Sequence, residues 1–562
     1  MAIDSNSTSY PTPAPPAVFV EKLSFRYRSL DEIPQPKRQK KIPETETSEL
    51  PLTIEDISFS LPAGKLMLIA GPSGCGKSTL LKCLNGLIPH SYKGALSGEI
   101  QLHGKSTKGL SLRDLAQHVG TMLQDPDKQI LGSTVEQEIA FGMENLGIPR
   151  VQMRERITSV LKQLRLEHYQ GQATHALSGG QRQQVAAAGL VVMEPSIFLF
   201  DEPFANLDSR AVDELEELIQ QLLLRGSTII IIEHRVEEAL RLKPDKVLML
   251  RDGRQIYFGD TEQFLEIADP TQVKLPIEST LRTLSDPSQS SNILIRPIVT
   301  GQENTIVTDE HILEFENVHY QYHTYSEEIL HGISFHVKRG ETIALLGPNG
   351  SGKTTLVKQA LGLLRPTKGS VRIFGQDTRE LSVAQMASNI GYVFQSPSAM
   401  LFAPSVRKEV SFGPENLRFS PERMNTAVKE AEEALNVAEF DQRSPFSLSF
   451  GQQKRVSIAS VLAMRGKILL LDEPTAGQDY RSYIAFMEHL RKMPYLDVLL
   501  IITHDLDLAL RFTQRILLLK EGNLVGDGPP LEVLANPDVL EECNLRQTSL
   551  LQHLLKERNA VA

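Results

Sequence analysis

The sequence predicts an α/β protein made of two tandem copies of one phosphate-binding domain, each built around a parallel β-sheet. The pattern G-x-x-x-x-G-K-[ST] occurs twice, as GPSGCGKST from Gly71 to Thr79 and as GPNGSGKTT from Gly347 to Thr355. Each copy follows a short apolar run and precedes a helix-like stretch. This order of strand, glycine-rich turn and helix is the first observation that predicts the fold.

Short apolar runs bounded by polar residues are the second observation. Examples are Ile197–Phe200, Ile229–Ile232 and Val498–Ile502. Such runs are typical of strands that are buried on both faces of a parallel sheet. A membrane-spanning helix needs about 18 or more apolar residues in succession, so we expect any membrane spans to come from other chains.

The halves repeat their motifs in the same order, which indicates duplication of a whole domain. The expected organisation is a flexible N-terminus at 1–17, a first domain at 18–263, a linker at 264–310, a second domain at 311–545 and a C-terminal tail at 546–562. Residues 29–50 are polar and charged with three prolines, and predict a flexible insertion. The helix-like stretch after Pro529 is expected either to hold the halves together or to pack on its own domain.

Composition narrows the class of protein. The net charge is −10, which argues against a nucleic-acid-binding surface. The three cysteines, Cys75, Cys83 and Cys543, have spacings that suit neither a disulfide framework nor a metal site. A reducing cytosol is the expected environment.

The two glycine-rich loops are expected to bind ATP. Successive backbone N–H groups of such a turn surround a phosphate, and the following helix N-terminus adds partial positive charge. Lys77 and Lys353 are expected to reach the β- and γ-phosphates, and Ser78 and Thr354 to hold Mg²⁺. The remaining expected contacts are Gly71, Pro72, Ser73, Gly74, Cys75, Gly76 and Thr79 in the first loop, and Gly347, Pro348, Asn349, Gly350, Ser351, Gly352 and Thr355 in the second.

Three further motifs follow each loop in a fixed order. LSGGQ (Leu177–Gln181) and LSFGQ (Leu448–Gln452) precede the acidic sequences FDEPFANLD and LDEPTAGQD, and then IIEH and IITH. Occurring twice in this order, the motifs resemble those of the ATP-binding cassette (ABC) family of P-loop NTPases. The resemblance implies that each half has a parallel-sheet core, an antiparallel β subdomain and a helical subdomain that carries the signature.

The resemblance also implies that the two cassettes pair head to tail, with two ATP molecules at their interface. Each site would join the phosphate loop of one half to the signature of the other. Site one would combine Lys77, Ser78, Asp201, Glu202 and His234 with Ser449, Gly451 and Gln452. Site two would combine Lys353, Thr354, Asp472, Glu473 and His504 with Ser178, Gly179, Gly180 and Gln181.

Roles within the sites follow from charge and from the resemblance. Asp201 and Asp472 would bind Mg²⁺, while Glu202 and Glu473 would activate the attacking water. His234 and His504 would contact the γ-phosphate. Gln124 and Gln395 would sense the γ-phosphate and Mg²⁺. Tyr27 and Tyr322 would stack on adenine. A core position is the alternative for the two tyrosines.

Two residues depart from the family pattern. Phe450 replaces the first glycine of the second signature, a change able to weaken site one, and Gln478 replaces the more usual leucine after the second acid pair. Neither change removes a catalytic group. Because both glutamates are present, two hydrolytic sites are predicted.

The segment Leu123–Gly142 is similar to the ATPases of energy-coupling factor (ECF) transporters, which import vitamins and metal ions. The similarity implies a transmembrane scaffold subunit, a membrane substrate-binding subunit, and a peripheral location at the cytoplasmic side of the cell membrane. A coupling helix of the scaffold would enter a groove next to this segment. The apolar residues that suit either such a groove or the core of the helical subdomain are Ile130, Leu131, Val135, Ile139 and Phe141.

Three other classes use paired cassettes. Ribosome-associated translation factors carry a strongly basic linker, whereas residues 264–310 hold three basic and seven acidic residues. ATPases of DNA repair and chromosome maintenance need a long coiled-coil or zinc insertion, and the sequence has neither. Fused sugar-import ATPases often have one degraded site, whereas both acid pairs are intact here. An ATPase coupled to transmembrane transport is therefore the favoured function.

Overall fold

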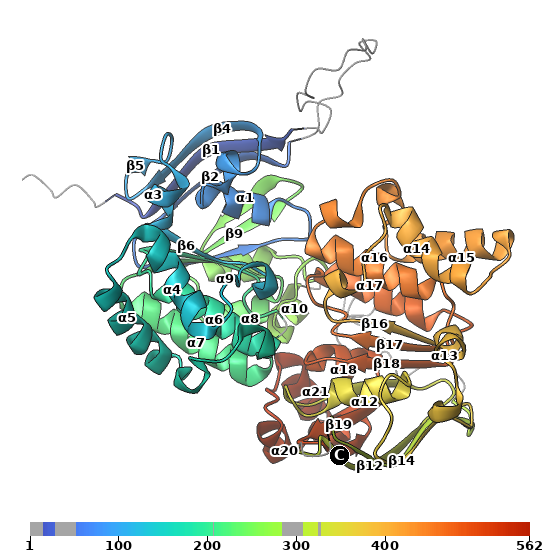
Figure 1. The fold of residues 1–562 in the computed structure, drawn as a ribbon. Helices are drawn as coiled ribbons and strands as arrows, with labels where there is room; N and C mark the ends of the chain where they lie inside the picture. The colour runs from blue at the N-terminus through green and yellow to red at the C-terminus, as the bar shows by residue number, and fades with distance from the viewer. Residues whose placement is uncertain (1–14, 29–51, 206, 284–306, 324–326, 562) are drawn as a thin grey trace, which may run out of the picture.

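The computed structural model describes residues 15–28, 52–205, 207–283, 307–323 and 327–561. The expected insertion at 29–50 lies outside the described residues, as do positions 1–14 of the expected N-terminus and positions 284–306 of the expected linker. The two halves lie side by side, the first coloured blue to green and the second yellow to red (Figure 1).

The first half is organised around a parallel sheet whose central strand leads into the phosphate loop. Strand β3 (Leu66–Ala70) lies between β8 (Thr228–Ile232) and β9 (Lys246–Arg251). The sheet continues through β7 (Ile197–Asp201) to β6 (Val119–Met122). Every residue of β3 and β8 is buried, which explains why these strands are unbroken apolar runs.

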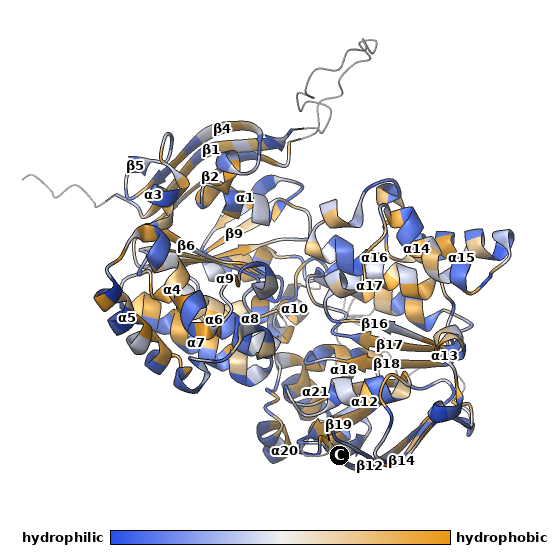
Figure 2. Ribbon diagram, in the orientation of Figure 1, coloured by the Kyte–Doolittle hydropathy of each residue, from blue (hydrophilic) through white to orange (hydrophobic). Residues whose placement is uncertain are grey.

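The second half repeats this sheet. Strand β13 (Thr342–Leu346) lies between β18 (Val498–Ile502) and β19 (Arg515–Lys520). Strands β17 (Ile468–Asp472) and β16 (Ile390–Val393) continue it with parallel pairing. The hydrophobic colouring of Figure 2 follows these strands and the helix faces that cover them.

An antiparallel sheet stands at the start of each half. In the first half it joins the parallel sheet through a single β2–β10 pairing, which gives one ten-stranded sheet, whereas the two sheets are separate in the second half. The strands of the first half are β1 (Val18–Tyr27), β2 (Ile54–Leu61), β4 (Gly94–Leu102), β5 (Lys105–Ser106) and β10 (Arg254–Gly259). Those of the second half are β11 (His311–Tyr320), β12 (Leu330–Lys338), β14 (Lys368–Ile373), β15 (Gln376–Asp377) and, on the parallel sheet, β20 (Asn523–Gly528).

A helical subdomain carries the signature in each half. Its helices are α4 (Val135–Leu146), α5 (Arg150–Gln163) and α6 (Gly179–Val191) in the first half, and α14 (Val406–Asn416), α15 (Pro421–Ala434) and α16 (Phe450–Leu462) in the second. Serine and glutamine of each signature form a capping box at the start of α6 and α16. The signature therefore fixes where its helix begins.

The remaining helices cover the sheets or connect the layers. They are α1 (Lys77–Leu84), α2 (Leu87–His90), α3 (Leu112–Ala116), α7 (Ser209–Leu224), α8 (Val236–Leu240), α9 (Thr261–Ile267) and α10 (Ile277–Thr283) in the first part of the chain. In the second part they are α12 (Lys353–Ala360), α13 (Val383–Asn389), α17 (Tyr480–Arg491), α18 (Leu506–Phe512), α19 (Pro530–Val533), α20 (Pro537–Glu542) and α21 (Ser549–Val561). Within the described ranges, no helix is both long and apolar enough to cross a membrane.

The chain passes from one half to the other through packed structure. Val273 and Leu275 belong to the core of the first half, and Ile277 to the core of the second. The amide of Ile277 donates to Ser549 Oγ at 3.0 Å, so the start of α10 is tied to the start of α21. Helix α21 also buries Leu551 in the second core. The C-terminal helix therefore packs on its own half and touches the connecting segment, and the Ser549 amide also donates to Glu237 of the first half at 3.0 Å.

Candidate functional site

Each phosphate loop needs glycine at its first position. Gly71 and Gly347 have φ angles of 146° and 144°. A Cβ atom at these positions would overlap the carbonyl oxygens of Leu250 and Leu519 on the neighbouring strands. Glycine alone avoids this overlap, so the loops can pass close to the sheet and turn their amides outward.

The loop lysines are held inside the turns that precede them. Lys77 Nζ donates to the carbonyl oxygens of Gly71 and Pro72 at 2.8 and 2.9 Å, and Lys353 Nζ makes the matching bonds in the second loop at 2.7 and 2.8 Å. Helices α1 and α12 begin at these lysines. The ammonium group and the helix N-terminus therefore place positive charge at one point.

The acidic group of the first half is assembled from three strand ends. Gln124 Nε2 donates to Glu202 Oε2 at 2.5 Å, and His234 Nε2 lies 3.0 Å from Glu202 Oε1. Asp201 ends β7, and its buried Oδ1 has no hydrogen-bond partner among the described residues. Glu202 has a φ of 49°, a left-handed conformation that is strained for glutamate.

The second half repeats this cluster with different partners. Tyr392 donates its hydroxyl hydrogen to Asp472 Oδ2 at 2.9 Å, and His504 Nε2 lies 3.4 Å from Glu473 Oε1. The Thr503 hydroxyl lies 3.3 Å from Glu473 Oε2 and donates to it. Gln395 is exposed at its loop, so its side chain is not part of this cluster as that of Gln124 is in the first half.

The pKa values of Glu202 and Glu473 are shifted in opposite directions. Although burial opposes its charge, His234, Lys77 and Gln124 hold the pKa of Glu202 below its ordinary value. Burial and the neighbouring Asp472 raise the pKa of Glu473 to about 7. Burial, together with the Lys353 ammonium, lowers the pKa of His504 to about 3. Burial and Glu202 raise the pKa of Asp201 to about 7.

The interface between the halves brings each phosphate loop to a segment of the other half. The Asn349 amide donates to Asp208 Oδ2 at 3.3 Å, and Asn349 also lies next to Gly180 of the first signature. In the mirrored contact, the Ser73 side chain lies near the Asp479 carboxylate and, although burial opposes the charge, helps Ser482 to hold its pKa below the ordinary value. The second loop and the first signature thus lie together, as the head-to-tail arrangement requires.

Sequence reasoning did not single out Asp208 and Asp479. They cap helices α7 and α17 by accepting the amides of Ala211 and Ser482. Their positions in the sequence could have indicated them. Each is the last residue of an acidic motif, FDEPFANLD or LDEPTAGQD, and the two residues are 271 positions apart. Each of these carboxylates therefore both caps a helix of its own half and contacts the phosphate loop of the other half.

The two departures from the family pattern remain near site one. Phe450 packs against Gly477 of its own half, and a Cβ on Gly477 would also lie 3.0 Å from Gln124 Nε2. Gln478 is buried and donates to the Pro474 carbonyl at 2.9 Å. Neither side chain replaces a member of the acid clusters.

The two tyrosines lie beside the phosphate-loop helices. The hydroxyls of Tyr27 and Thr79 are 3.3 Å apart, and those of Tyr322 and Thr355 are 3.2 Å apart. Tyr322 is 48% exposed, so its ring is open to a ligand.

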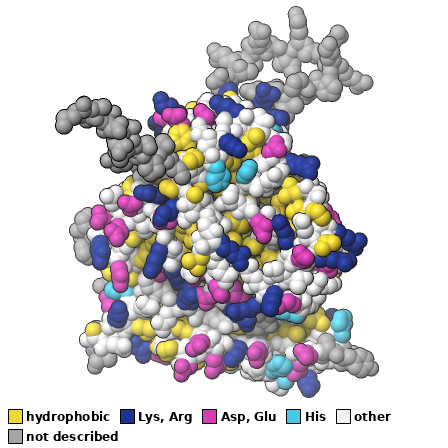
Figure 3. Space-filling view, turned by 90° about the vertical axis from the view of Figure 1, so that its left-hand side faces the viewer, with side chains coloured by type: hydrophobic (Ala, Val, Ile, Leu, Met, Phe, Trp, Pro, Cys, Tyr) yellow, Lys and Arg dark blue, Asp and Glu magenta, His cyan; other side chains and the backbone are white. Residues whose placement is uncertain are grey.

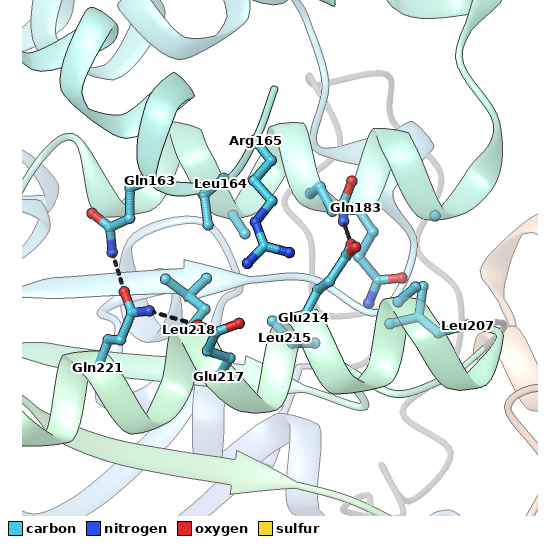
Figure 4. A pocket seen from close by; sticks show the side chains of 14 residues that line it. Gln163, Leu164, Arg165, Gln183, Leu207, Glu214, Leu215, Glu217, Leu218 and Gln221 are labelled. Atoms are coloured by element: carbon cyan, nitrogen blue, oxygen red, sulfur yellow. Dashed lines mark hydrogen bonds between the residues drawn. The ribbon is translucent and has the colours of Figure 1, made fainter. Parts of the chain in front are cut away.

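A separate pocket lies between α6 and α7 of the first half (Figure 4). Gln163 donates to Gln221 at 2.9 Å across its rim, and Leu215 and Leu218 contribute to its lining. It contains no residue of the phosphate loops or the acid clusters. It shares Gly180 of the first signature with candidate site two, and so borders that site.

Apolar side chains next to the glutamine loops divide into core and surface. Val135 and Ile139 are fully buried, so they belong to the core of the helical subdomain. Leu131 and Phe141 are exposed, by 69% and 43%. Ile130 is half-buried.

Comparison with known proteins gives a family match in both halves. A family model described as "ABC transporter" matches residues 54–205 and 330–476. A putative ABC transporter ATP-binding protein of Vibrio vulnificus (strain CMCP6) is 35% identical over 555 residues, which cover 94% of this chain and 93% of the relative. A protein of the same description from Bacillus cereus (strain ATCC 10987) is 36% identical over 523 residues, covering 89% of this chain and 92% of the relative.

One solved structure is also similar to part of the chain. It is described as cbiO1 from Clostridium perfringens, part of the ABC transporter complex cbiONQ. It is 28% identical, covers 48% of this chain and 98% of its own, and has a TM-score of 0.37. The family match rests on the model in both halves and on the relatives of nearly full length.

Proposed function

We propose, because this chain belongs to the ABC transporter family of ATP-binding proteins, that it is the ATP-hydrolysing subunit of a membrane importer of the ECF type. Membership of the family makes the chain an ATPase whose hydrolysis is coupled to transport. The importer type, the membrane location at the cytoplasmic side and the two membrane partners are the proposed part.

The proposed reaction is transfer of the γ-phosphoryl group of ATP to water at two composite sites. Such reactions are accelerated mainly by positioning and by charge neutralisation. Lys77 and Lys353 would hold the phosphates, and the signature capping boxes at Ser178 and Ser449 would supply helix N-termini from the opposite half. Glu202 and Glu473 would orient water and accept its proton.

The donor set of each site fits Mg²⁺. In site one, Ser78 and Asp201 would hold the ion, and the orphaned buried Asp201 Oδ1 supports this assignment. Thr354 and Asp472 would do so in site two. When bound, the ion would neutralise phosphate charge, while the protein residues place the water and the phosphoryl group.

The observation that carries the transport proposal is an exposed apolar pair at matching positions of both halves. Leu131 and Phe141 of the first half correspond to Phe402 and Phe412 of the second at an offset of 271 residues. All four are exposed, and the rings of Phe402 and Phe412 meet edge to face at 4.7 Å between centroids. Two matching apolar surfaces next to the glutamine loops suit two cytoplasmic helices of one membrane subunit.

The distribution of charge on one face of the molecule argues against the ribosome-binding alternative. Figure 3 shows one face of the molecule, on which acidic and basic side chains are interspersed. Binding to a phosphate backbone requires clustered positive charge. The observed mixture favours a protein partner over a nucleic acid.

The test is copurification from native membranes in mild detergent. The tagged chain should retain a polytopic membrane subunit and a small membrane binding protein, and a Phe402→Asp/Phe412→Asp variant should lose both while keeping its ATPase activity. A matched control is Val383→Asp, because Val383 is 73% exposed outside this surface. Recovery of ribosomal subunits in place of membrane proteins would refute the proposal.

A further inference from the structure

The residue after the first switch histidine reaches into the second half. Arg235 Nη2 donates to Thr475 Oγ1 at 3.3 Å and lies 4.0 Å from Asp505 Oδ2. Thr475 follows Glu473 by two positions, and Asp505 directly follows His504. The Arg235 guanidinium therefore contacts both segments that carry the acid and the histidine of site two.

The same short segment also belongs to site one. His234, next to Arg235, lies 3.0 Å from Glu202. The buried Glu233 carboxylate accepts the amides of His234 at 2.8 Å and of Arg235 at 3.1 Å. This clamp fixes one turn whose consecutive side chains face the two different sites.

Within the described residues, the second half does not return this contact. Asp505 stands at the position of Arg235 and caps helix α18, accepting the amides of Asp507 and Leu508 at 3.0 and 3.2 Å. Thr503 stands at the position of Glu233 and donates to Glu473. The arrangement is therefore asymmetric, and the first half alone supplies the arginine.

A buried lysine reinforces the asymmetry. Lys274, from the connecting segment, lies 2.8 Å from Asp507 Oδ2 and 3.5 Å from Asp505 Oδ1. Although burial opposes its charge, Lys274 and Arg235 lower the pKa of Asp505 to about 2. The segment after His504 is thus held by two cations that come from outside the second domain.

We propose that Arg235 is a positioning residue of site two, supplied by the segment that carries the histidine of site one. The guanidinium fixes Thr475 and Asp505 by a hydrogen bond and an ion pair, and so fixes the orientation of Glu473 and His504. Its planar donors suit a bridge between two acceptors better than a lysine does. This inference rests on the proposed roles of Glu202 and Glu473.

The experiment measures each site separately in the full chain. Glu202→Gln leaves site two as the hydrolytic site, and Glu473→Gln leaves site one. Arg235→Met, Arg235→Lys and Arg241→Met are introduced into both backgrounds, and kcat and KM are recorded. A cavity between the halves is lined by both Arg235 and Arg241, together with His504 of the second half. Arg241 is the matched control because it pairs with Glu216 of its own half at 3.6 Å.

The inference predicts a loss confined to site two. Arg235→Met should lower kcat of site two about tenfold with little change in KM, as expected when an oriented group is lost. Arg235→Lys keeps the cation without the planar donors and should restore part of kcat. Arg241→Met should match its background.

Two results would overturn the inference. One is an equal fall of kcat in both backgrounds, which would mean that Arg235 only holds the halves together. The other is an unchanged site two. Failure of the proposed roles of Glu202 and Glu473 would give a different result. The Glu202→Gln/Glu473→Gln chain would then hydrolyse ATP at the wild-type rate.

Discussion

The Asn349 amide, in the second phosphate loop, donates to the Asp208 carboxylate of the first half at 3.3 Å. This contact crosses the interface and places the second loop beside the signature of the first half. Asp479 and Ser73 make the mirrored contact. Each aspartate also caps a helix of its own half, so the position of each loop is tied to the opposite core.

Asp208→Asn should weaken ATP binding at site two while leaving the fold intact. Asparagine caps a helix about as well as aspartate, whereas Asp208→Ala should also lose about 1 kcal/mol of stability. The measurement is ATP affinity in a Lys77→Ala background, in which site two alone binds. In a Lys353→Ala background the same substitution should change little, and an equal effect in both would contradict the crossed contact.

The two sites should differ in their response to pH. Water activation needs ionised glutamate, and the pKa of Glu473 is raised to about 7 while that of Glu202 is lowered. As pH falls through about 7, site two should therefore lose activity while site one retains it. Profiles of kcat for Glu202→Gln and Glu473→Gln chains measure the two limbs, and superimposable limbs would contradict the assigned environments.

Two glycines of the first loop should differ in their tolerance of alanine. A Cβ at Gly71 would overlap the Leu250 carbonyl, whereas a Cβ at Gly74 meets no atom within 4 Å. Gly74→Ala should cost about 1 kcal/mol, because φ is positive there. Gly71→Ala should cost clearly more and abolish ATP binding. Thermal unfolding of the two variants measures the difference, and equal Tm values would contradict the close approach of Gly71 to the Leu250 carbonyl.

Buried Lys454 should make stability rise with pH. It donates to the carbonyl oxygens of Phe394, Gln395 and Asp472, and burial lowers its pKa to about 8. The unfolded chain then binds more protons between pH 8 and the ordinary lysine pKa, so stability increases across that window. The shift corresponds to about 3 kcal/mol.

Lys454→Gln provides the comparison, because glutamine occupies the matching position, Gln183, in the first half. The free energy of unfolding of the variant should be less dependent on pH over this window. Chemical denaturation of both chains between pH 8 and 10.5 measures the difference. Parallel curves would contradict a charge penalty at Lys454.

The sequence was sufficient for the fold because its strongest signals are local. The prediction of two ABC cassettes is confirmed by the family model and by the paired parallel sheets. The strands could be predicted from unbroken apolar runs, because strands such as β3 and β8 are buried along their whole length. Glycine, lysine and serine or threonine at fixed spacing define the loops whatever their surroundings are.

Contacts between distant segments could not be predicted in this way. Nothing in the sequence shows that Arg235 reaches Thr475, because this pairing depends on how the halves pack. Likewise, Gln124 and Gln395 occupy equivalent motif positions, yet of these two glutamines only Gln124 has a hydrogen bond to its acid pair in the described part of the chain. The different pKa values of Glu202 and Glu473 arise from neighbours on other strands.

The most direct test of the central claim, two composite ATP sites, uses two double substitutions that each remove one lysine and one signature serine. Both are made in the Glu202→Gln/Glu473→Gln chain, and ATP retained per chain is counted after gel filtration. Lys77→Ala/Ser449→Ala disables one composite site and should leave about one ATP, whereas Lys77→Ala/Ser178→Ala disables both and should leave about none. The reverse outcome would show that each loop works with its own signature, and would contradict the account.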